Sequence, residues 1–165
     1  MKMSCLPVSL FGDICSGKME LVDWAREAKD MGYDGIDISI MFLKNRTPTY
    51  LAALKRQLNE IGMPIIMMTT YPDFTHPDSV QREREMLYLK ADVALASELG
   101  IRYLRILAGQ AHADVSREDC IKWVSDAFHE IDEYGKKFGV GLLFENHGKP
   151  GAWDKVDFTF DPQNF

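Results

Sequence analysis

The stretch GVGLLFENHGKPGAW, residues 139–153, combines the two features on which the fold and the function of this chain depend. A short apolar run stops abruptly at a carboxylate, an amide and an imidazole, which belong to Glu145, Asn146 and His147. A loop marked by glycine and proline follows directly. Short strands that are apolar on both faces are typical of parallel sheets covered by helices. The stretch therefore predicts a buried parallel strand with polar groups gathered at its carboxyl end.

The rest of the chain repeats the same unit, because apolar residues at helical spacing alternate with short β-prone runs. The predicted strands cover residues 5–12, 35–41, 63–71, 101–109 and 140–146, and the predicted helices cover residues 18–33, 44–62, 77–100 and 116–137. The second helix has the clearest ends, with Thr47 as its N-cap, Pro48 at its first position and Gly62 at its end. This alternation predicts an α/β fold built on a parallel sheet.

Two α/β architectures compete for this pattern. A doubly wound sheet would require a G-x-G-x-x-G fingerprint after the first strand. The segment FGDICSGK, residues 11–18, has its two glycines five positions apart and does not match that fingerprint. A βα barrel requires only continued repetition, and its functional groups also lie at the carboxyl ends of the strands. We therefore predict a (β/α) TIM-barrel type of fold.

The composition is that of one globular domain with enough length for a core, since 46% of the 165 residues are hydrophobic and 27% are charged. The net charge of −6 argues against nucleic acid or an anionic membrane as the main partner. The three cysteines form no C-x-x-C pair and are odd in number, so we expect a reducing, cytoplasmic environment. No apolar run approaches the roughly 20 residues of a membrane span. A small molecule is the expected partner.

Three segments resemble the xylose isomerase-like TIM barrels, a family of sugar isomerases and epimerases that also includes endonuclease relatives. They are AREAKDMGYDGIDI (25–38), ASELGIRYLRILAG (96–109) and YGKKFGVGLLFENHGKPGAW (134–153). The similarity covers essentially the whole chain. It implies that Glu145, at the end of the fifth strand, is a ligand of a divalent metal. Asp37 stands where relatives commonly have a glutamate, which is a departure from the family pattern.

The length is a larger departure, because a complete barrel needs about 250 residues. We expect one domain over residues 1–165, an incomplete barrel of about five parallel strands and four helices that is truncated before strand six. The resemblance implies that the other metal ligands of the family, an Asp, a His and a Glu, belong to strands six to eight. Asp161 is interpreted as the N-cap of a further helix that begins at Pro162. The alternative, a sixth strand with Asp161 as a metal ligand, leaves only 15 residues between Asn146 and Asp161, too few for a helical crossover.

The resemblance implies a metal-assisted isomerisation or epimerisation of a sugar or sugar phosphate. A proton next to a carbonyl group is removed and returned through an enediolate, whose negative charge a divalent cation stabilises. Oxygen-rich ligation with a single histidine favours Mn²⁺, Mg²⁺ or Co²⁺. Glu145 would bind the metal and be the catalytic residue, with Asn146 just beyond it. His147, Lys149 and Trp153 would contact the sugar.

Several of these residues have a structural interpretation beside the functional one. Arg105, on the fourth strand, either faces an anionic substrate or pairs with a carboxylate such as Glu145. His147 can serve in loop hydrogen bonding, and Trp153 can pack its loop against the barrel. His76 and His112 follow the third and fourth strands, where endonuclease relatives keep zinc-binding histidines, but their loose spacing favours an ordinary structural role.

Three functional interpretations follow. The first is a sugar isomerase or epimerase that, as this chain alone, binds metal weakly or not at all and is inactive. The second is a non-catalytic half-barrel, either an association module or a truncated product. The third, an endonuclease-like phosphodiesterase, is disfavoured by the acidic pI near 5.2. Truncation would leave strands one and five with unpaired edges, so we also expect a homo-oligomer that associates through these edges.

Overall fold

The computed structural model describes residues 1–164, and it divides the chain into two compact units. The first unit contains Met1–Thr69 together with Leu95–Tyr103. The second unit contains Thr70–Ala94 together with the residues from Leu104 onward. In residues 1–164, no helix is both long enough and apolar enough to span a bilayer.

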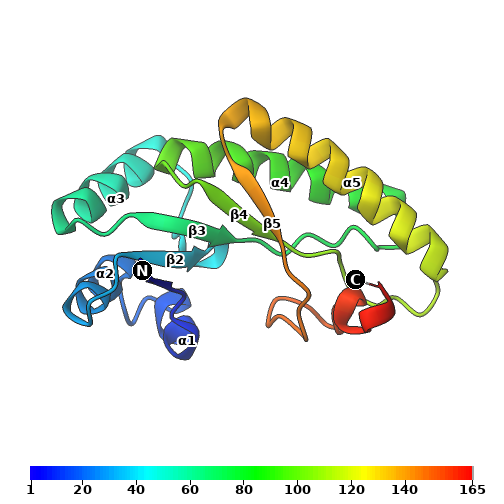
Figure 1. Ribbon diagram of the computed structural model, residues 1–165, viewed down its shortest axis with the longest axis horizontal. Coiled ribbons are helices and arrows are strands. Elements are labelled where there is room, and N and C mark those ends of the chain that lie inside the picture. The colour runs from blue at the N-terminus through cyan, green and yellow to red at the C-terminus, as the bar shows by residue number, and fades with distance from the viewer. Residues whose placement is uncertain (165) are drawn as a thin grey trace. The chain divides into compact units, whose positions relative to one another are not determined.

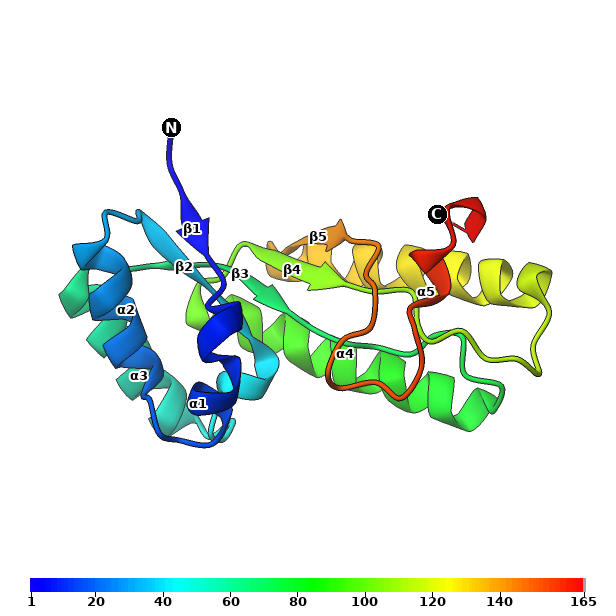
Figure 2. The same ribbon diagram turned by 90° about the horizontal axis from the view of Figure 1, so that it is seen from below.

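The first unit places three parallel strands against helices. Its elements are β1 (Ser4–Cys5), η1 (Val8–Leu10), α1 (Phe11–Cys15), α2 (Leu21–Asp30), β2 (Gly35–Ser39), η2 (Ile40–Phe42), α3 (Pro48–Ile61) and β3 (Ile65–Thr69). Strand β2 pairs in parallel with both β1 and β3, and all five of its residues are buried. Helices α2 and α3 lie side by side (Figure 2). Helix α2 turns one apolar face inward because Leu21, Trp24 and Ala28 recur at helical spacing.

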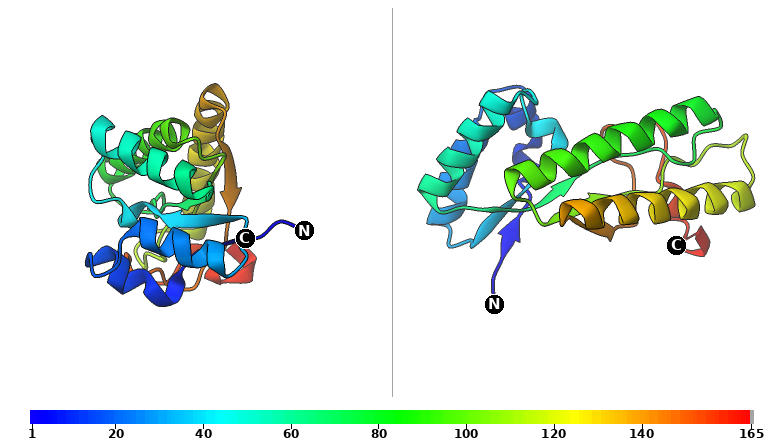
Figure 3. Two further views of the ribbon diagram at one scale, coloured as in Figure 1. Left: turned by 90° about the vertical axis from the view of Figure 1, so that its left-hand side faces the viewer. Right: turned by 90° about the horizontal axis from the view of Figure 1, so that it is seen from above.

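The second unit contains the later strands and most of the two longest helices. Its elements are α4 (Ser79–Leu99), which ends in the first unit, β4 (Tyr103–Ile106), α5 (Arg117–Phe138), β5 (Gly141–Phe144), η3 (Phe158–Phe160) and η4 (Pro162–Asn164). Helices α4 and α5 run side by side (Figures 1 and 3). The start of α5 is capped by Ser116, whose hydroxyl accepts a hydrogen bond of 3.1 Å from the amide of Asp119.

The strand order confirms the predicted fold class. The five strands are parallel and follow one another in the order β1-β2-β3-β4-β5. A doubly wound sheet would reverse this order at a switch point. The observed order is the one produced when each strand is added beside the previous one, as in βα barrels.

The predicted first strand is largely wrong. Only Ser4–Cys5 form a strand, and the remainder of the predicted run, 8–12, lies in the turn η1 and the start of helix α1. Pro7 explains the difference, because it has no amide hydrogen for the sheet and its ring restricts φ, here to −78°. Its carbonyl instead accepts a hydrogen bond of 3.1 Å from the amide of Leu10.

The predicted ends of the later elements are mostly confirmed. Helix α3 has Thr47 as its N-cap and Pro48 at its start, and it ends at Gly62, which adopts a left-handed φ of +76°. At the C-terminal end of the described chain, Asp161 accepts a hydrogen bond of 3.0 Å from the amide of Gln163. The predicted helix start therefore exists as the 3-10 turn η4. The alternative of a sixth strand in FTFDPQNF, from residue 158 onward, is wrong for the described residues, because they form the turns η3 and η4.

Strand β5 is more exposed than the strands before it. Leu143 and Phe144 expose 42% and 38% of their surface, although both are large apolar residues. Strand β2, by contrast, is buried throughout. Apolar residues on a terminal strand of a sheet are suited to association. The homo-oligomer expected from the sequence stays a prediction.

Candidate functional site

The second unit brings together the segments that follow β3, β4 and β5. Parallel pairing continues beyond the strands. The amide of Thr70 donates a hydrogen bond of 3.0 Å to the carbonyl of Arg105, and the amide of Phe74 donates one of 3.1 Å to the carbonyl of Ala108. The amide of Glu145 donates to the carbonyl of Ile106 over 3.3 Å. The carboxyl ends of parallel strands are where α/β folds place their functional groups. These segments define the candidate site.

The centre of the site is an ion pair between Arg105 and Glu145. The Arg105 Nη1 atom lies 2.7 Å from the Glu145 Oε2 atom. The arginine side chain is only 7% exposed, whereas that of Glu145 is 46% exposed. The guanidinium carbon also lies 5.4 Å from the centre of the Tyr71 ring. The carboxylate partner that the sequence suggested for Arg105 is confirmed, and the buried arginine holds a carboxylate that solvent can still reach.

The loop after β5 is held by its own tryptophan. Trp153 is buried, and its Nε1 atom donates a hydrogen bond of 3.2 Å to the carbonyl of Tyr71. Its amide donates to the carbonyl of Pro150 over 3.0 Å. Lys149 is exposed and His147 is half-buried. Trp153 therefore anchors the loop, as its structural interpretation predicts, while Lys149 and His147 remain open to a ligand.

Gln110, which the sequence analysis did not single out, links three segments. Its amide and its Nε2 atom donate to the two carboxylate oxygens of Asp73, over 2.9 and 2.8 Å. Its Oε1 atom accepts hydrogen bonds from the amides of Asp154 and Lys155, each at 2.9 Å. One side chain thus fixes the loop of Trp153 to the segments that follow β3 and β4.

Asp73 is buried, and its carboxylate accepts the hydrogen bonds that Gln110 donates. Besides Gln110, it accepts a hydrogen bond of 2.9 Å from the Thr75 hydroxyl, and its Oδ2 atom lies 2.9 Å from His112 Nε2. Burial alone would raise the pKa of Asp73, but the hydrogen bonds from Gln110, His112 and Thr75 together outweigh it and hold this pKa below its usual range. The carboxylate is therefore stabilised in its ionised form.

A pH dependence of stability follows from Asp73. A carboxyl whose pKa is lowered by folding contributes stability above its unfolded pKa of about 3.9, and that contribution is lost as the pH falls further. We expect Asp73→Asn to be destabilised most above about pH 4, with the difference from the unmodified chain shrinking at lower pH. Urea unfolding at several pH values measures this difference. Asp30→Asn, at an exposed position, is the control, and a difference that grows on acidification would contradict the expectation.

His76 and His112 do come together, although their spacing in the sequence is loose. Their ring centres lie 5.1 Å apart in an edge-on arrangement. His112 contacts Asp73, and the Nδ1 atom of His76 accepts a hydrogen bond of 3.1 Å from the amide of Asp78. These contacts explain both rings as parts of the loops after β3 and β4.

Asp157 is the third unexpected residue of the site. It is 1% exposed, and its Oδ1 atom accepts two hydrogen bonds from Thr159, of 2.7 Å from the amide and 2.6 Å from the hydroxyl. Its own amide donates to the carbonyl of Gly148 over 2.7 Å. Burial raises the pKa of Asp157, although hydrogen bonds from Thr159 and the charges of His147 and Arg105 oppose the shift. A buried carboxyl group therefore lies in the loop that follows β5.

Asp37 belongs to the first unit. It is buried in β2, and its Oδ2 atom accepts a hydrogen bond of 3.0 Å from the Ser4 hydroxyl. Burial raises the pKa of Asp37, against the lowering effect of this hydrogen bond. The side chain is thus positioned by the start of β1.

A metal site is not completed by residues 1–164, because they contain no group of three His, Cys, Asp or Glu side chains that could hold an ion. The Glu145 carboxylate shares its Oε2 atom with Arg105, which reduces its charge toward a cation. A hard divalent ion needs several oxygen or imidazole ligands that converge. The residues present therefore do not fit the metal that the resemblance implies.

We accordingly expect the 165-residue chain to bind Mn²⁺ or Mg²⁺ weakly or not at all. Calorimetric titration with Mn²⁺ measures this directly. One tight site that is lost in Glu145→Gln would contradict the expectation, since it would require ligands supplied from elsewhere, such as a second copy of the chain.

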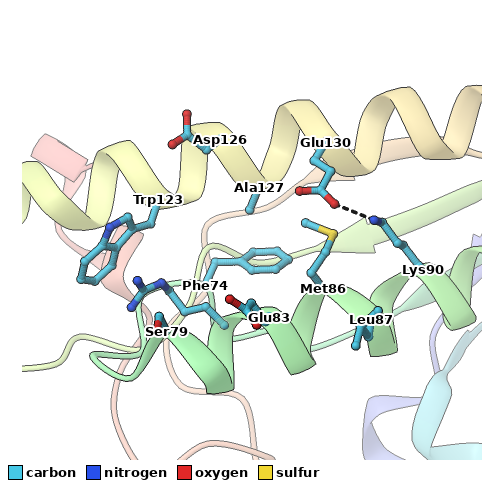
Figure 4. Close-up of a pocket in the computed structure, with 11 residues that line it drawn as sticks. Phe74, Ser79, Glu83, Met86, Leu87, Lys90, Trp123, Asp126, Ala127 and Glu130 are labelled. Atoms are coloured by element: carbon cyan, nitrogen blue, oxygen red, sulfur yellow. Dashed lines mark hydrogen bonds and ion pairs between the residues drawn. The ribbon is translucent and has the colours of Figure 1, made fainter.

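A separate hollow lies between α4 and α5 (Figure 4). Its volume is about 450 Å³, and Phe74, Met86 and Ala127 form part of its lining. Three of its charged side chains have partners: Arg82 lies over the Trp123 ring, 3.6 Å from its centre, and Lys90 pairs with Glu130 at 2.5 Å. The groove is therefore lined by both helices, and Arg82, Lys90 and Glu130 in it are already engaged with one another's helix.

Comparisons with known proteins agree with this fold. A family model described as xylose isomerase-like TIM barrel matches residues 25–161. No curated protein matches the sequence at a significant level. Among solved structures, 3-keto-D-glucoside 4-epimerase from E. coli is 16% identical with a TM-score of 0.69, and 88% of this chain covers 59% of that one.

Two further solved structures show the same fold. D-psicose 3-epimerase with D-tagatose, from Clostridium cellulolyticum H10, is 11% identical with a TM-score of 0.75, and 90% of this chain covers 53% of it. The IolI protein with a binding zinc atom is 18% identical with a TM-score of 0.70, and 91% of this chain covers 53% of it. The chain thus spans somewhat more than half the length of these relatives.

Proposed function

Since the chain belongs to the xylose isomerase-like TIM barrel family, we propose that it serves in the isomerisation or epimerisation of a sugar, which it binds at the Arg105–Glu145 pair. The observation that carries this proposal is the pair itself, a buried guanidinium that presents a half-exposed carboxylate at the carboxyl end of parallel strands. Solved structures of similar fold include epimerases that act on sugars. Sugar is therefore the substrate class that the proposal assigns.

The reaction class sets what the site must do. Isomerases and epimerases of this kind remove a proton from a carbon beside a carbonyl group, so negative charge develops on the substrate oxygen. The buried Arg105 is positioned to stabilise that charge, because a cation shielded from water acts more strongly on a neighbouring oxygen. Glu145 accepts hydrogen bonds from substrate hydroxyls, and Lys149 and His147 border the sugar from the loop.

The same proposal limits what the chain does by itself. Residues 1–164 provide the half-exposed Glu145 carboxylate in the site and no cluster of metal ligands around it. We therefore propose that the 165-residue chain binds sugar at this site without appreciable turnover. A half-barrel that serves association alone would not bind sugar there.

Calorimetric titration with D-fructose tests the proposal. Saturable binding is expected for the unmodified chain, and Glu145→Gln should weaken it at least about tenfold because a charged hydrogen-bond acceptor is lost. Glu118→Gln, at an exposed position in the first turn of α5, should leave the affinity unchanged. Absence of saturable binding, or equal affinity in both variants, would contradict the proposal.

A further inference from the structure

The loop of Trp153 closes on itself between Gly148 and Asp157, where the amide of Asp157 donates a hydrogen bond of 2.7 Å to the carbonyl of Gly148. Loops of this length whose ends meet are Ω-loops, and they are frequently functional. Residues 149–156 form neither helix nor strand. The position of the loop therefore depends on the contacts that it makes with the segments beside it.

Gln110 makes the side-chain contact that ties this loop to the segment after β4. Its Oε1 atom accepts hydrogen bonds from the amides of Asp154 and Lys155, each at 2.9 Å. The neighbouring amide of Ala111 donates to the carbonyl of Val156 over 2.9 Å. A carbonyl oxygen has two lone pairs, so the loop occupies both acceptor positions of Gln110 Oε1. The bonds come from the main chain of the loop, and the side chains of Asp154 and Lys155 are exposed.

Asp73 fixes the orientation of the Gln110 side chain. The Nε2 atom of Gln110 donates to Asp73 Oδ2 over 2.8 Å, and the amide of Gln110 donates to Asp73 Oδ1 over 2.9 Å. An ionised carboxylate only accepts hydrogen bonds. If the side-chain amide of Gln110 were turned over, its oxygen would face the carboxylate and its NH₂ group would face two amides. Asp73 therefore directs Gln110 Oε1 toward the loop.

The loop also contacts the surroundings of the central ion pair. Trp153 Nε1 donates a hydrogen bond of 3.2 Å to the carbonyl of Tyr71. The ring of Tyr71 lies with its centre 5.4 Å from the guanidinium carbon of Arg105. The same loop carries Lys149, which is exposed. A loop released from Gln110 would thus loosen the border of the site beside Arg105.

We propose that Gln110 is a positioning residue of the sugar site. It sets the affinity for sugar by holding residues 148–157 in place, and it does not touch the sugar itself. This inference rests on the proposed function and adds to it a residue outside the Arg105–Glu145 pair. Because the sugar contacts the loop in its held position, binding of the sugar and holding of the loop stabilise one another.

Nuclear magnetic resonance of the ¹⁵N-labelled chain measures the hold on the loop through the indole Nε1–H signal of Trp153, which Trp153→Phe assigns by removing it. In Gln110→Ala this hydrogen should exchange with solvent at least about tenfold faster, because the loop loses two hydrogen bonds. Calorimetric titration should show D-fructose bound at least about tenfold more weakly. Two controls should match the unmodified chain: Gln57→Ala, exposed on α3, and Asp154→Ala, which keeps the loop amide.

A paired exchange separates positioning from a general loss of stability. Gln110→Glu alone keeps an acceptor for the loop but places a second carboxylate against Asp73, so it should weaken D-fructose as Gln110→Ala does. Gln110→Glu combined with Asp73→Asn restores a donor opposite an acceptor. The combined variant should bind D-fructose within about threefold of the unmodified chain, since the two changes act on one contact.

Unchanged indole exchange or unchanged D-fructose affinity in Gln110→Ala would overturn the inference and leave the proposed function standing. A paired variant that binds no better than Gln110→Glu would do the same. If Gln110→Ala fails to fold, the unmodified chain decides: D-fructose should slow the exchange of the Trp153 indole hydrogen saturably, and no change would overturn the inference. Absence of any sugar binding in the calorimetric titration would refute both proposals.

Discussion

Gly109→Ala is expected to destabilise the chain by about 3 kcal/mol or more. A Cβ atom at this position would lie 2.3 Å from the Thr75 hydroxyl oxygen, 2.6 Å from Asp73 Oδ1 and 2.8 Å from the Thr75 amide. Gly109 also has a φ of +141°, which L side chains rarely adopt. The substitution thus adds backbone strain to a steric clash, and it displaces the hydrogen bonds that gather on Asp73.

Urea unfolding of Gly109→Ala measures this loss, and Gly148→Ala is the matched control. A Cβ atom at Gly148 would meet nothing within 4 Å. Its substitution should therefore change stability by no more than about 0.5 kcal/mol. Equal stability of the two variants would show that the segment after β4 does not pack against Asp73 and Thr75 as described.

Arg105→Ala is expected to have the second largest effect, since it removes the buried cation that pairs with Glu145. Loss of one partner of a buried ion pair costs about 3–5 kcal/mol. Glu145 exposes 46% of its side chain, so water compensates part of the loss and about 2 kcal/mol is expected. Sugar binding should be lost together with this stability, because Arg105 also holds Glu145 in place.

The control for Arg105→Ala is Lys122→Ala. Lys122 pairs with Asp126 at 2.7 Å, but both side chains are about 70% exposed. Such a surface pair contributes at most about 1 kcal/mol. Urea unfolding should therefore separate the two variants clearly. A loss for Arg105→Ala no larger than that for Lys122→Ala would contradict the role given to the buried guanidinium.

The fold was predictable from the sequence where local signals and hydrophobic periodicity agree. Helix α3 illustrates this, because Thr47, Pro48 and Gly62 mark its ends independently of the rest of the fold. The first strand shows the limit. Its residues are β-prone, but Pro7 ends the strand after Cys5 and the chain turns into α1. A proline inside a β-prone run was the available signal.

The candidate site was predictable only in part. Glu145 and Arg105 stand on or directly after apolar strands, so their pairing could be anticipated from strand order and charge. Asp73 and Gln110 could not, because their roles come from contacts between segments more than 35 residues apart, such as the 37-residue separation of Gln110 from Asp73. The one sequence signal for a functional role of Asp73 and Gln110 is that both stand shortly after a predicted strand.

The most direct test of the central claim, that sugar binds at the Arg105–Glu145 pair, is a crystal structure of the chain grown in D-fructose. The account predicts one sugar molecule with hydroxyl groups within hydrogen-bond distance of the Glu145 carboxylate and of Arg105, bordered by the loop of Trp153. A sugar bound in the hollow between α4 and α5, with the Arg105–Glu145 pair untouched, would contradict it.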